Sequence, residues 1–239
     1  MTTDTTNVDQ SELAKFSALA HRWWDPQSEF KPLHDINPLR LDYIDRLAGG
    51  LGTRRIVAVG CGGGILSEAM ARRGASVTGL DLSEKALMVA RLHALESAIS
   101  VDYQLQSVEN FAAANAGAFD IVTCMELLEH VPDPGRSIAA CAALLRPGGL
   151  AVFSTINRNP KSYLFAVIGA EYVLRLLPRG THEYARFIRP SELCRHARNA
   201  GIEPIEVTGM TYNPLAKRYR LEADTSVNYI VGCRKPALQ

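Results

Sequence analysis

Short apolar runs alternate with segments of helical periodicity along the middle of the chain. The apolar runs occupy residues 55–59, 76–80, 100–104, 119–124 and 150–154. Segments with helical spacing of apolar residues lie between them, at residues 64–73, 83–97, 109–114 and 134–145. Strands that alternate with helices in this way pair in parallel, and the crossover helices cover both faces of the sheet. The pattern therefore predicts an α/β fold with a doubly wound sheet.

The two ends of the chain depart from this alternation. At the N-terminus, the pattern predicts a flexible tail at residues 1–10, an amphipathic helix at 11–24, an irregular proline-containing segment at 25–38 and a short helix at 37–47. At the C-terminus, it predicts a helix at 191–200 and two strands, at 203–212 and 227–234, that form an antiparallel hairpin at the sheet edge. We expect a single domain over residues 11–239, with an insert at 157–190.

Composition and charge narrow the class of protein. The chain has 239 residues, 47% of them hydrophobic and 21% charged, with a net charge of +1, so no global field favours nucleic acid. Its five cysteines contain no CxxC pair, which indicates reduced thiols rather than a disulfide framework. No apolar run approaches the ~20 residues that span a bilayer. We therefore expect a cytoplasmic protein that binds no nucleic acid.

The stretch IVAVGCGGG, residues 56–64, joins a predicted strand to a predicted helix through a glycine-rich turn. Bare amides at the carboxyl end of a sheet are typical of nucleotide-binding turns. Asp81 ends the next strand, 21 residues after Gly60, where its carboxylate can accept both hydroxyls of a ribose. A dinucleotide site favours G-x-G-x-x-G, and Ile65 occupies its third glycine position. An NAD-dependent oxidoreductase is therefore the disfavoured alternative.

The pattern G-x-G-x-G, together with FDIVTCMELLEHV at 119–131 and LRPGG at 145–149, resembles class I S-adenosylmethionine-dependent methyltransferases. This resemblance implies a Rossmann-like fold whose sheet has seven strands, mostly parallel with an antiparallel last strand. It also implies N-terminal helices and a helical insert after the fifth strand. S-adenosylmethionine is the implied cosubstrate.

Longer strings resemble one family more closely. KFSALAHRWWDPQSEFKPLHDINPLRLDYI, at 15–44, and FSTINRNPKSYLFAVIGAEYVLRLLPRGTHEYARFIRP, at 153–190, are similar to the ubiquinone-biosynthesis O-methyltransferase family, as is most of the sequence between residues 7 and 234. The resemblance implies O-methylation of catechol or phenol hydroxyls on polyprenylated ubiquinone precursors. It also implies cofactor contacts, which fall on Arg40, Gly60, Gly62, Asp81 and Met125 of this sequence.

Arg40 and a further position, Ala58, raise questions about cofactor binding. Arg40 suits a bidentate contact with the methionine carboxylate, and the alternative for it is an exposed helix charge. Ala58 stands where the family usually carries an acidic residue near the charged methionine end of the cofactor. Losing a charge-assisted hydrogen bond weakens binding by ~1.5–3 kcal/mol, roughly ten- to a hundredfold. Ala58 therefore implies weak cofactor affinity, a compensating contact, or a catalytically impaired relative that binds lipid or a partner.

Candidate acid–base residues lie in MELLEHV, which offers Glu126, Glu129 and His130. If this segment is helical, spacings of three and four place all three side chains on one face. Two carboxylates and an imidazole suit a divalent metal, and the family resemblance implies Mg²⁺ at these residues. Because Mg²⁺ prefers oxygen ligands, His130 is alternatively the general base that deprotonates the phenol. The alternative is a solvated helix end with no catalytic or metal-binding role.

The insert at 157–190 is long for a connection in such a fold. From residue 158 to 189 it holds six Arg or Lys and two Glu, and its centre is apolar. A basic, apolar helix too short to span a bilayer suits a membrane surface, where a polyprenylated substrate resides. We expect peripheral association with the inner face of the membrane and with a ubiquinone-biosynthesis complex. The alternative is a buried helix that covers the domain core.

Overall fold

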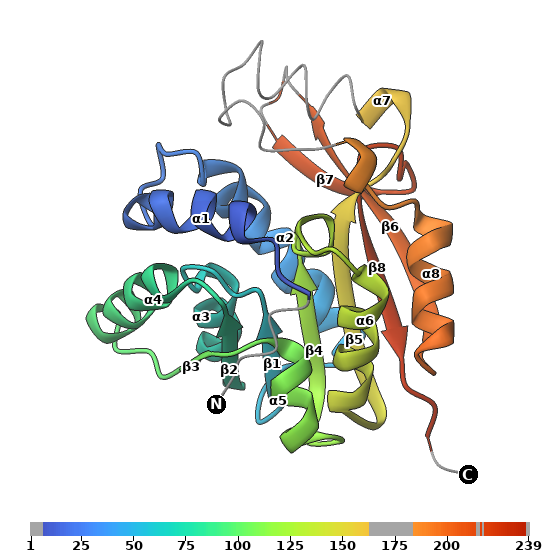
Figure 1. Ribbon diagram of the computed structural model, residues 1–239, viewed down its shortest axis with the longest axis horizontal. Helices are drawn as coiled ribbons and strands as arrows, with labels where there is room; N and C mark the ends of the chain where they lie inside the picture. The colour runs from blue at the N-terminus through green and yellow to red at the C-terminus, as the bar shows by residue number, and fades with distance from the viewer. Residues whose placement is uncertain (1–6, 163–183, 214–215, 217, 238–239) are drawn as a thin grey trace.

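A mixed β-sheet forms the centre of the computed structural model, which describes residues 7–162, 184–213, 216 and 218–237 (Figure 1). Within these residues the sheet has eight strands in the order β3-β2-β1-β4-β5-β8-β6-β7. The five strands from β3 to β5 in this order are parallel, whereas β8 is antiparallel to both of its neighbours and β7 is antiparallel to β6. The strands are β1 Arg55–Val59, β2 Ser76–Asp81, β3 Asp102–Leu105, β4 Phe119–Met125, β5 Leu145–Ile156, β6 Glu203–Asn213, β7 Arg218–Glu222 and β8 Asn228–Arg234.

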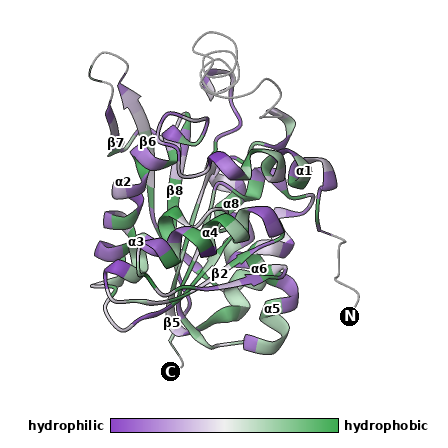
Figure 2. Cartoon of the chain, turned by 90° about the vertical axis from the view of Figure 1, so that its left-hand side faces the viewer, coloured by the Kyte–Doolittle hydropathy of each residue, from purple (hydrophilic) through white to green (hydrophobic). Residues whose placement is uncertain are grey.

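Helices cover both faces of this sheet. In chain order they are α1 Gln10–Leu19, η1 Ala20–Arg22, α2 Lys31–Ala48, α3 Ile65–Arg72, α4 Glu84–Glu96, α5 Val108–Asn115, η2 Leu128–His130, α6 Pro134–Leu144, α7 Pro160–Ser162, η4 Tyr184–Arg186 and α8 Pro190–Asn199. One buried cluster packs α2 and α3 on the sheet, and another packs α5, α6 and α8 on its opposite face. Figure 2 shows apolar residues gathered along the central strands between these layers.

Local sequence signals explain where the main helices begin. Ser83 and Ser107 cap α4 and α5, and each side chain accepts a hydrogen bond from a backbone amide of the first turn. Asp133 caps α6 in the same way, and Pro134 follows at the first helical position. These capping residues follow the parallel strands, so they place the strand ends and the helix starts along one edge of the sheet.

Three expectations about the chain ends are wrong. α2 begins at Lys31 rather than at residue 37. A proline in the first turn of a helix loses no hydrogen bond, so Pro32 permits this start. Pro38 lies inside the helix. β6 and β8 pair antiparallel as expected, but they do not form a hairpin at the sheet edge. β7 follows β6 in the chain and forms the edge hairpin with it, and β8 lies between β5 and β6. The sheet in the described chain therefore has one strand more than the expected seven.

The expected flexible tail at 1–10 is also too long. Asn7 is buried, and its side-chain amide donates to Glu109, to Ser137 and to the carbonyl of Asp133. Residues 1–6 lie outside the described residues, as do residues 163–183 of the insert, on which its expected helix falls. Among the helices that the structure describes, none is both long and apolar enough to cross a membrane.

Candidate active site

The glycine-rich turn connects β1 to α3 and brings Asp81 against its amides. Gly60, Gly62 and Gly64 all have positive φ angles, of 67°, 52° and 89°, which glycine adopts without steric cost. The amide of Gly62 donates to Asp81 Oδ2 and the amide of Ser83 to Oδ1, each at 2.8 Å. Burial raises the pKa of Asp81, and these amides partly oppose the shift. A carboxylate oxygen has two lone pairs, so both oxygens retain acceptor capacity for ribose hydroxyls.

Two tryptophans from the N-terminal segment cover this turn. A Cβ added at Gly62 or Gly63 would lie 2.1 or 2.2 Å from the Trp23 ring, so the indole rests directly on bare backbone. Trp24 Nε1 donates to the carbonyl of Gly63 at 2.8 Å, and its ring stacks on His93 with 3.3 Å between centroids. The amphipathic helix predicted at 11–24 includes both tryptophans, but its pattern indicates no role for the pair. The two adjacent tryptophans in HRWWD are the sequence feature that could have indicated this contact with the glycine turn.

Arg40 lies on α2 and is 5% exposed, which rules out the alternative of an exposed helix charge. Its Nη1 contacts Glu126 Oε2 at 2.5 Å, and Nη2 donates to the carbonyl of Leu33 at 3.2 Å. Its Nε has no hydrogen-bond partner among the described residues. Arg40 thus holds a buried positive charge at the end of β4, with one donor still available.

The segment after β4 is not the expected α-helix. Glu126 has a φ of 48°, so the chain turns immediately after Met125, and only Leu128–His130 form a short 3₁₀ helix. The Glu126 amide donates to the Ser154 carbonyl at 3.1 Å, and the Ser154 hydroxyl donates to Glu126 Oε1 at 2.8 Å. Because Glu126 lies outside the helical turn, its side chain takes different partners from Glu129 and His130.

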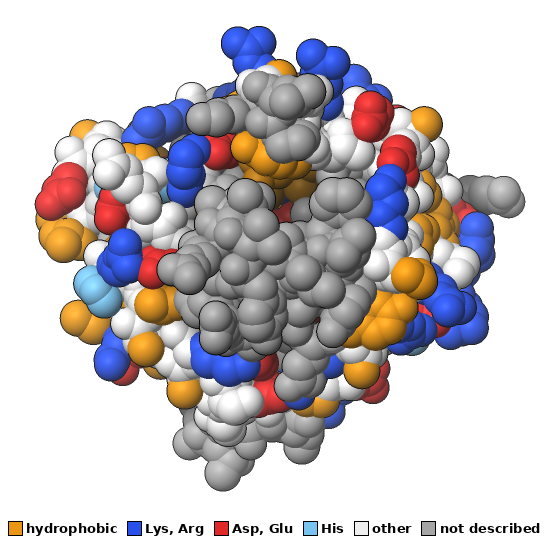
Figure 3. Space-filling model, turned by 90° about the horizontal axis from the view of Figure 1, so that it is seen from above, with side chains coloured by type: hydrophobic (Ala, Val, Ile, Leu, Met, Phe, Trp, Pro, Cys, Tyr) orange, Lys and Arg blue, Asp and Glu red, His pale blue; other side chains and the backbone are white. Residues whose placement is uncertain are grey.

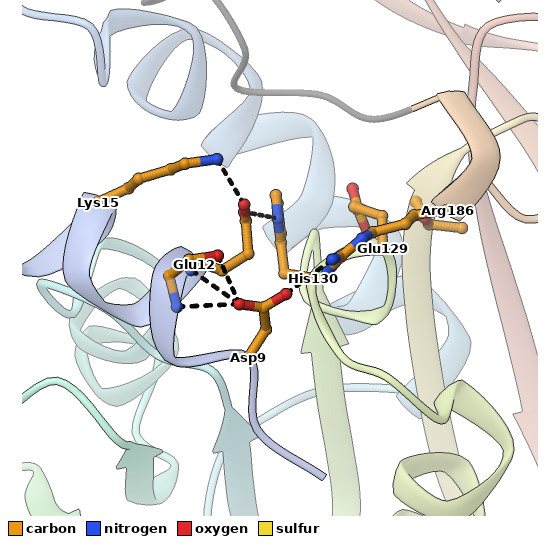
Figure 4. A network of polar contacts seen from close by, with 8 residues as sticks. Asp9, Glu12, Lys15, Glu129, His130 and Arg186 are labelled. Carbon is orange, nitrogen blue, oxygen red and sulfur yellow. Dashed lines mark hydrogen bonds and ion pairs between the residues drawn. The ribbon is translucent and has the colours of Figure 1, made fainter.

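Glu129 and His130 each have a separate partner, and Figure 4 shows the contact of His130 with Glu12. Glu129 is buried and accepts a hydrogen bond from the Thr155 hydroxyl at 2.7 Å, and burial raises its pKa. His130 Nδ1 lies 2.8 Å from Oε2 of Glu12, a residue of α1 that the sequence analysis missed. Burial disfavours the imidazolium, but the hydrogen bond with Glu12 and the charge of Glu129 outweigh it, so the pKa of His130 is raised.

The donor set tests whether a divalent metal fits these residues. No group of three or more His, Cys, Asp or Glu side chains in the described part of the chain is arranged to hold a metal ion. Glu126 pairs with Arg40, Glu129 with Thr155, and His130 with Glu12. In this geometry the three residues do not fit a shared metal.

Ala58 lies in the middle of β1, between Gly79 of β2 and Thr123 of β4. It is buried in the same apolar cluster as Met125 and Tyr43. Its methyl group offers no hydrogen bond to a ligand. The carboxylate that contacts Arg40 comes from Glu126, which directly follows the neighbouring strand β4.

The sheet order, the glycine turn and Asp81 together define a class I S-adenosylmethionine-dependent methyltransferase. A methyltransferase-domain family matches residues 33–207. The structure of magnesium protoporphyrin IX methyltransferase from Synechocystis PCC 6803 with bound SAM has the same fold, with a TM-score of 0.64, 18% identity and coverage of 96% of this chain and 99% of that one.

Curated relatives narrow the class. The ubiquinone biosynthesis O-methyltransferase of Thiobacillus denitrificans is 67% identical over 97% of this chain and 99% of its own length. The protein of the same name from Nitrosomonas europaea is 64% identical over 98% of this chain and 100% of its own. The chain belongs to the ubiquinone biosynthesis O-methyltransferase family.

Proposed function

We propose that this chain transfers the methyl group of S-adenosylmethionine to a catechol or phenol hydroxyl of a polyprenylated ubiquinone precursor. The observation that carries the proposal is the placement of His130 after β4, on the same sheet edge as the glycine turn and Asp81. Open α/β sheets bind their ligands at this edge. The full-length similarity to ubiquinone biosynthesis O-methyltransferases supports the choice of acceptor.

Each of the cofactor-binding residues contacts a different part of S-adenosylmethionine. Asp81 accepts the ribose hydroxyls, and the turn at Gly60 and Gly62 lets the ligand approach bare backbone. Met125 contributes an apolar surface at the end of β4. Arg40 binds the methionine carboxylate, either through its available Nε or in exchange for Glu126. When bound, S-adenosylmethionine supplies an electrophilic methyl group on a sulfonium.

His130 is the general base of this proposal. A free phenol has a pKa near ~10, so a base that takes its proton raises the nucleophilicity of the oxygen. Glu12 and Glu129 stabilise the imidazolium that forms. The negative charge of Glu126 acts on Arg40, and that of Glu129 acts on His130. Since Glu126, Glu129 and His130 do not fit a shared metal in this geometry, His130 acts as base without Mg²⁺ in this proposal. Activity that is lost on chelation and recovered with Mg²⁺ would contradict this.

Membrane association is part of the proposal and rests on the sequence of the insert. Arg158, Lys161, Arg186 and Arg189 flank the undescribed residues 163–183. Figure 3 shows Lys and Arg side chains around the rim of the face seen from above in Figure 1. Anionic lipids attract such clusters by about 1 kcal/mol per charge near the surface. Cosedimentation with anionic vesicles, compared with neutral vesicles, tests this association.

Methyl transfer tests the function itself. The substrate is a catechol with a short prenyl chain, and mass spectrometry follows the methylated product. We expect product from the unmodified chain and a loss of about 100-fold or more in kcat for His130→Gln, within the range of general-base catalysis. If the unmodified chain binds S-adenosylhomocysteine yet forms no product, the alternative of a catalytically impaired relative is correct.

A further inference from the structure

α1 brings a buried carboxylate to His130 from the far end of the sequence. Glu12 Oε2 lies 2.8 Å from His130 Nδ1, and the two residues are 118 positions apart. Glu12 is 6% exposed, and its second oxygen accepts from Lys15 Nζ at 2.7 Å (Figure 4). A glutamate in the first turn of a helix is usually solvated, so its burial against an imidazole calls for a functional reason.

α1 is held by contacts other than that of Glu12. Asp9 caps the helix by accepting from the amides of Ser11 and Glu12, and its Oδ2 contacts Arg186 at 2.7 Å. The buried side chain of Asn7 anchors the preceding residues, and the Ser17 hydroxyl lies 2.7 Å from that of Ser83. Several contacts at separate points therefore hold α1 in place, and Glu12 is available to act on His130.

The contact with Glu12 determines which ring nitrogen of His130 carries the hydrogen. An ionised carboxylate only accepts hydrogen bonds, so it favours the tautomer with hydrogen on Nδ1 and leaves Nε2 as the acceptor. Among the described residues no hydrogen bond reaches Nε2. The Phe16 ring packs edge-on against the imidazole, with 5.0 Å between centroids and 81° between planes, which limits rotation of the ring.

We propose that Glu12 is a positioning residue that fixes the tautomer and ring orientation of His130, so that Nε2 faces the acceptor hydroxyl. This inference rests on the proposed function, in which His130 is the base. The partner of His130 Nδ1 is Glu12 rather than Glu129, whose Oε2 accepts from the Thr155 hydroxyl. Lys15 and His130 both lower the pKa of Glu12, to about 2, so the carboxylate is ionised at neutral pH.

Glu12→Gln tests the inference, because a glutamine amide can also donate to Nδ1 and so favours the opposite tautomer. We expect kcat to fall by about 10- to 100-fold, with the KM for S-adenosylmethionine unchanged. Glu12→Asp, which keeps the acceptor, should recover part of the loss. Glu29→Gln is the matched control, since Glu29 pairs with Arg22 in the same N-terminal segment, and it should retain full activity.

¹⁵N spectra of the histidine-labelled full chain supply a readout independent of activity. His130→Gln assigns the His130 signals among the six histidines. We expect these signals to report hydrogen on Nδ1 in the unmodified chain and to change in Glu12→Gln. An unchanged tautomer in Glu12→Gln, or unchanged kcat, would overturn the positioning role. Full activity of His130→Gln would instead overturn the role of His130 as base, so the two failures are distinguishable.

Discussion

The buried Arg40 and the partly exposed Glu126 form an ion pair that joins α2 to the end of β4 beside the cofactor turn. The guanidinium and the carboxylate are 2.5 Å apart, and Ser154 holds the second carboxylate oxygen. Loss of Glu126 alone would leave the charge of Arg40 without a partner. A second carboxylate of suitable geometry that replaces Glu126 would keep this charge paired. The methionine carboxylate of the cofactor has that chemistry, so we propose that Arg40 recognises the charged end of the ligand.

Replacing Arg40 by Gln should weaken binding of S-adenosylhomocysteine about ten- to a hundredfold, because one charge-assisted contact is lost. Calorimetric titration measures the change in Kd. Arg46→Gln is the matched control on the same helix: Arg46 pairs with Glu206 at the surface and should leave Kd unchanged. Equal affinities for all three chains would remove Arg40 from the cofactor site.

Gly63→Ala should disrupt the contact between the turn and Trp23. The added methyl group would lie 2.2 Å from the indole, so Trp23 must move. We expect the free energy of unfolding to fall by about 1–3 kcal/mol, as for overpacked sites, and cofactor affinity to fall with it. Gly52→Ala is the control, because its nearest neighbour would be 3.9 Å away. Urea unfolding compares the two, and equal stabilities would contradict the packing described.

The intrinsic fluorescence of the chain should report cofactor binding. Trp23 and Trp24 are its only tryptophans, and both contact the glycine turn. We expect S-adenosylhomocysteine to change the emission with the same Kd that calorimetry gives, and NADH to produce no saturable change in indole emission after inner-filter correction. Calorimetric binding without any fluorescence change would place the ligand away from these indoles.

The contact between Glu12 and His130 should make stability depend on pH in a defined window. The hydrogen bond with His130, opposed by burial, lowers the pKa of Glu12 from 4.5 to about 2, so its contribution is present above 4.5 and lost as pH falls toward 2. The pKa of His130 is raised above 6.5, so its contribution is full below 6.5 and lost as pH rises through the raised value.

The stability difference between the unmodified chain and Glu12→Gln should therefore be largest between pH 4.5 and 6.5. Urea unfolding at pH 3, 5.5 and 9 measures the difference, and a value independent of pH would contradict the ionic contact.

The sequence predicted the strand and helix that flank the cofactor turn, because apolar runs and glycines determine backbone structure within a few residues of themselves. Local patterns missed β7, whose sequence RYRLE is largely charged, and the start of α2, where proline suggested a break. The spacing of Glu126, Glu129 and His130 implied one helical face, but the left-handed backbone at Glu126 separates them. The contact between Glu12 and His130 joins distant segments, so no local pattern encodes it.

Titration of the unmodified chain and of Ala58→Asp with S-adenosylhomocysteine shows whether Arg40, Asp81 and the glycine turn form a working cofactor site although residue 58 is alanine. We predict saturable one-to-one binding by the unmodified chain, with less than a tenfold change, about 1.4 kcal/mol, in Ala58→Asp. Binding that appears only when aspartate is introduced would contradict the account and mark this chain as an impaired methyltransferase.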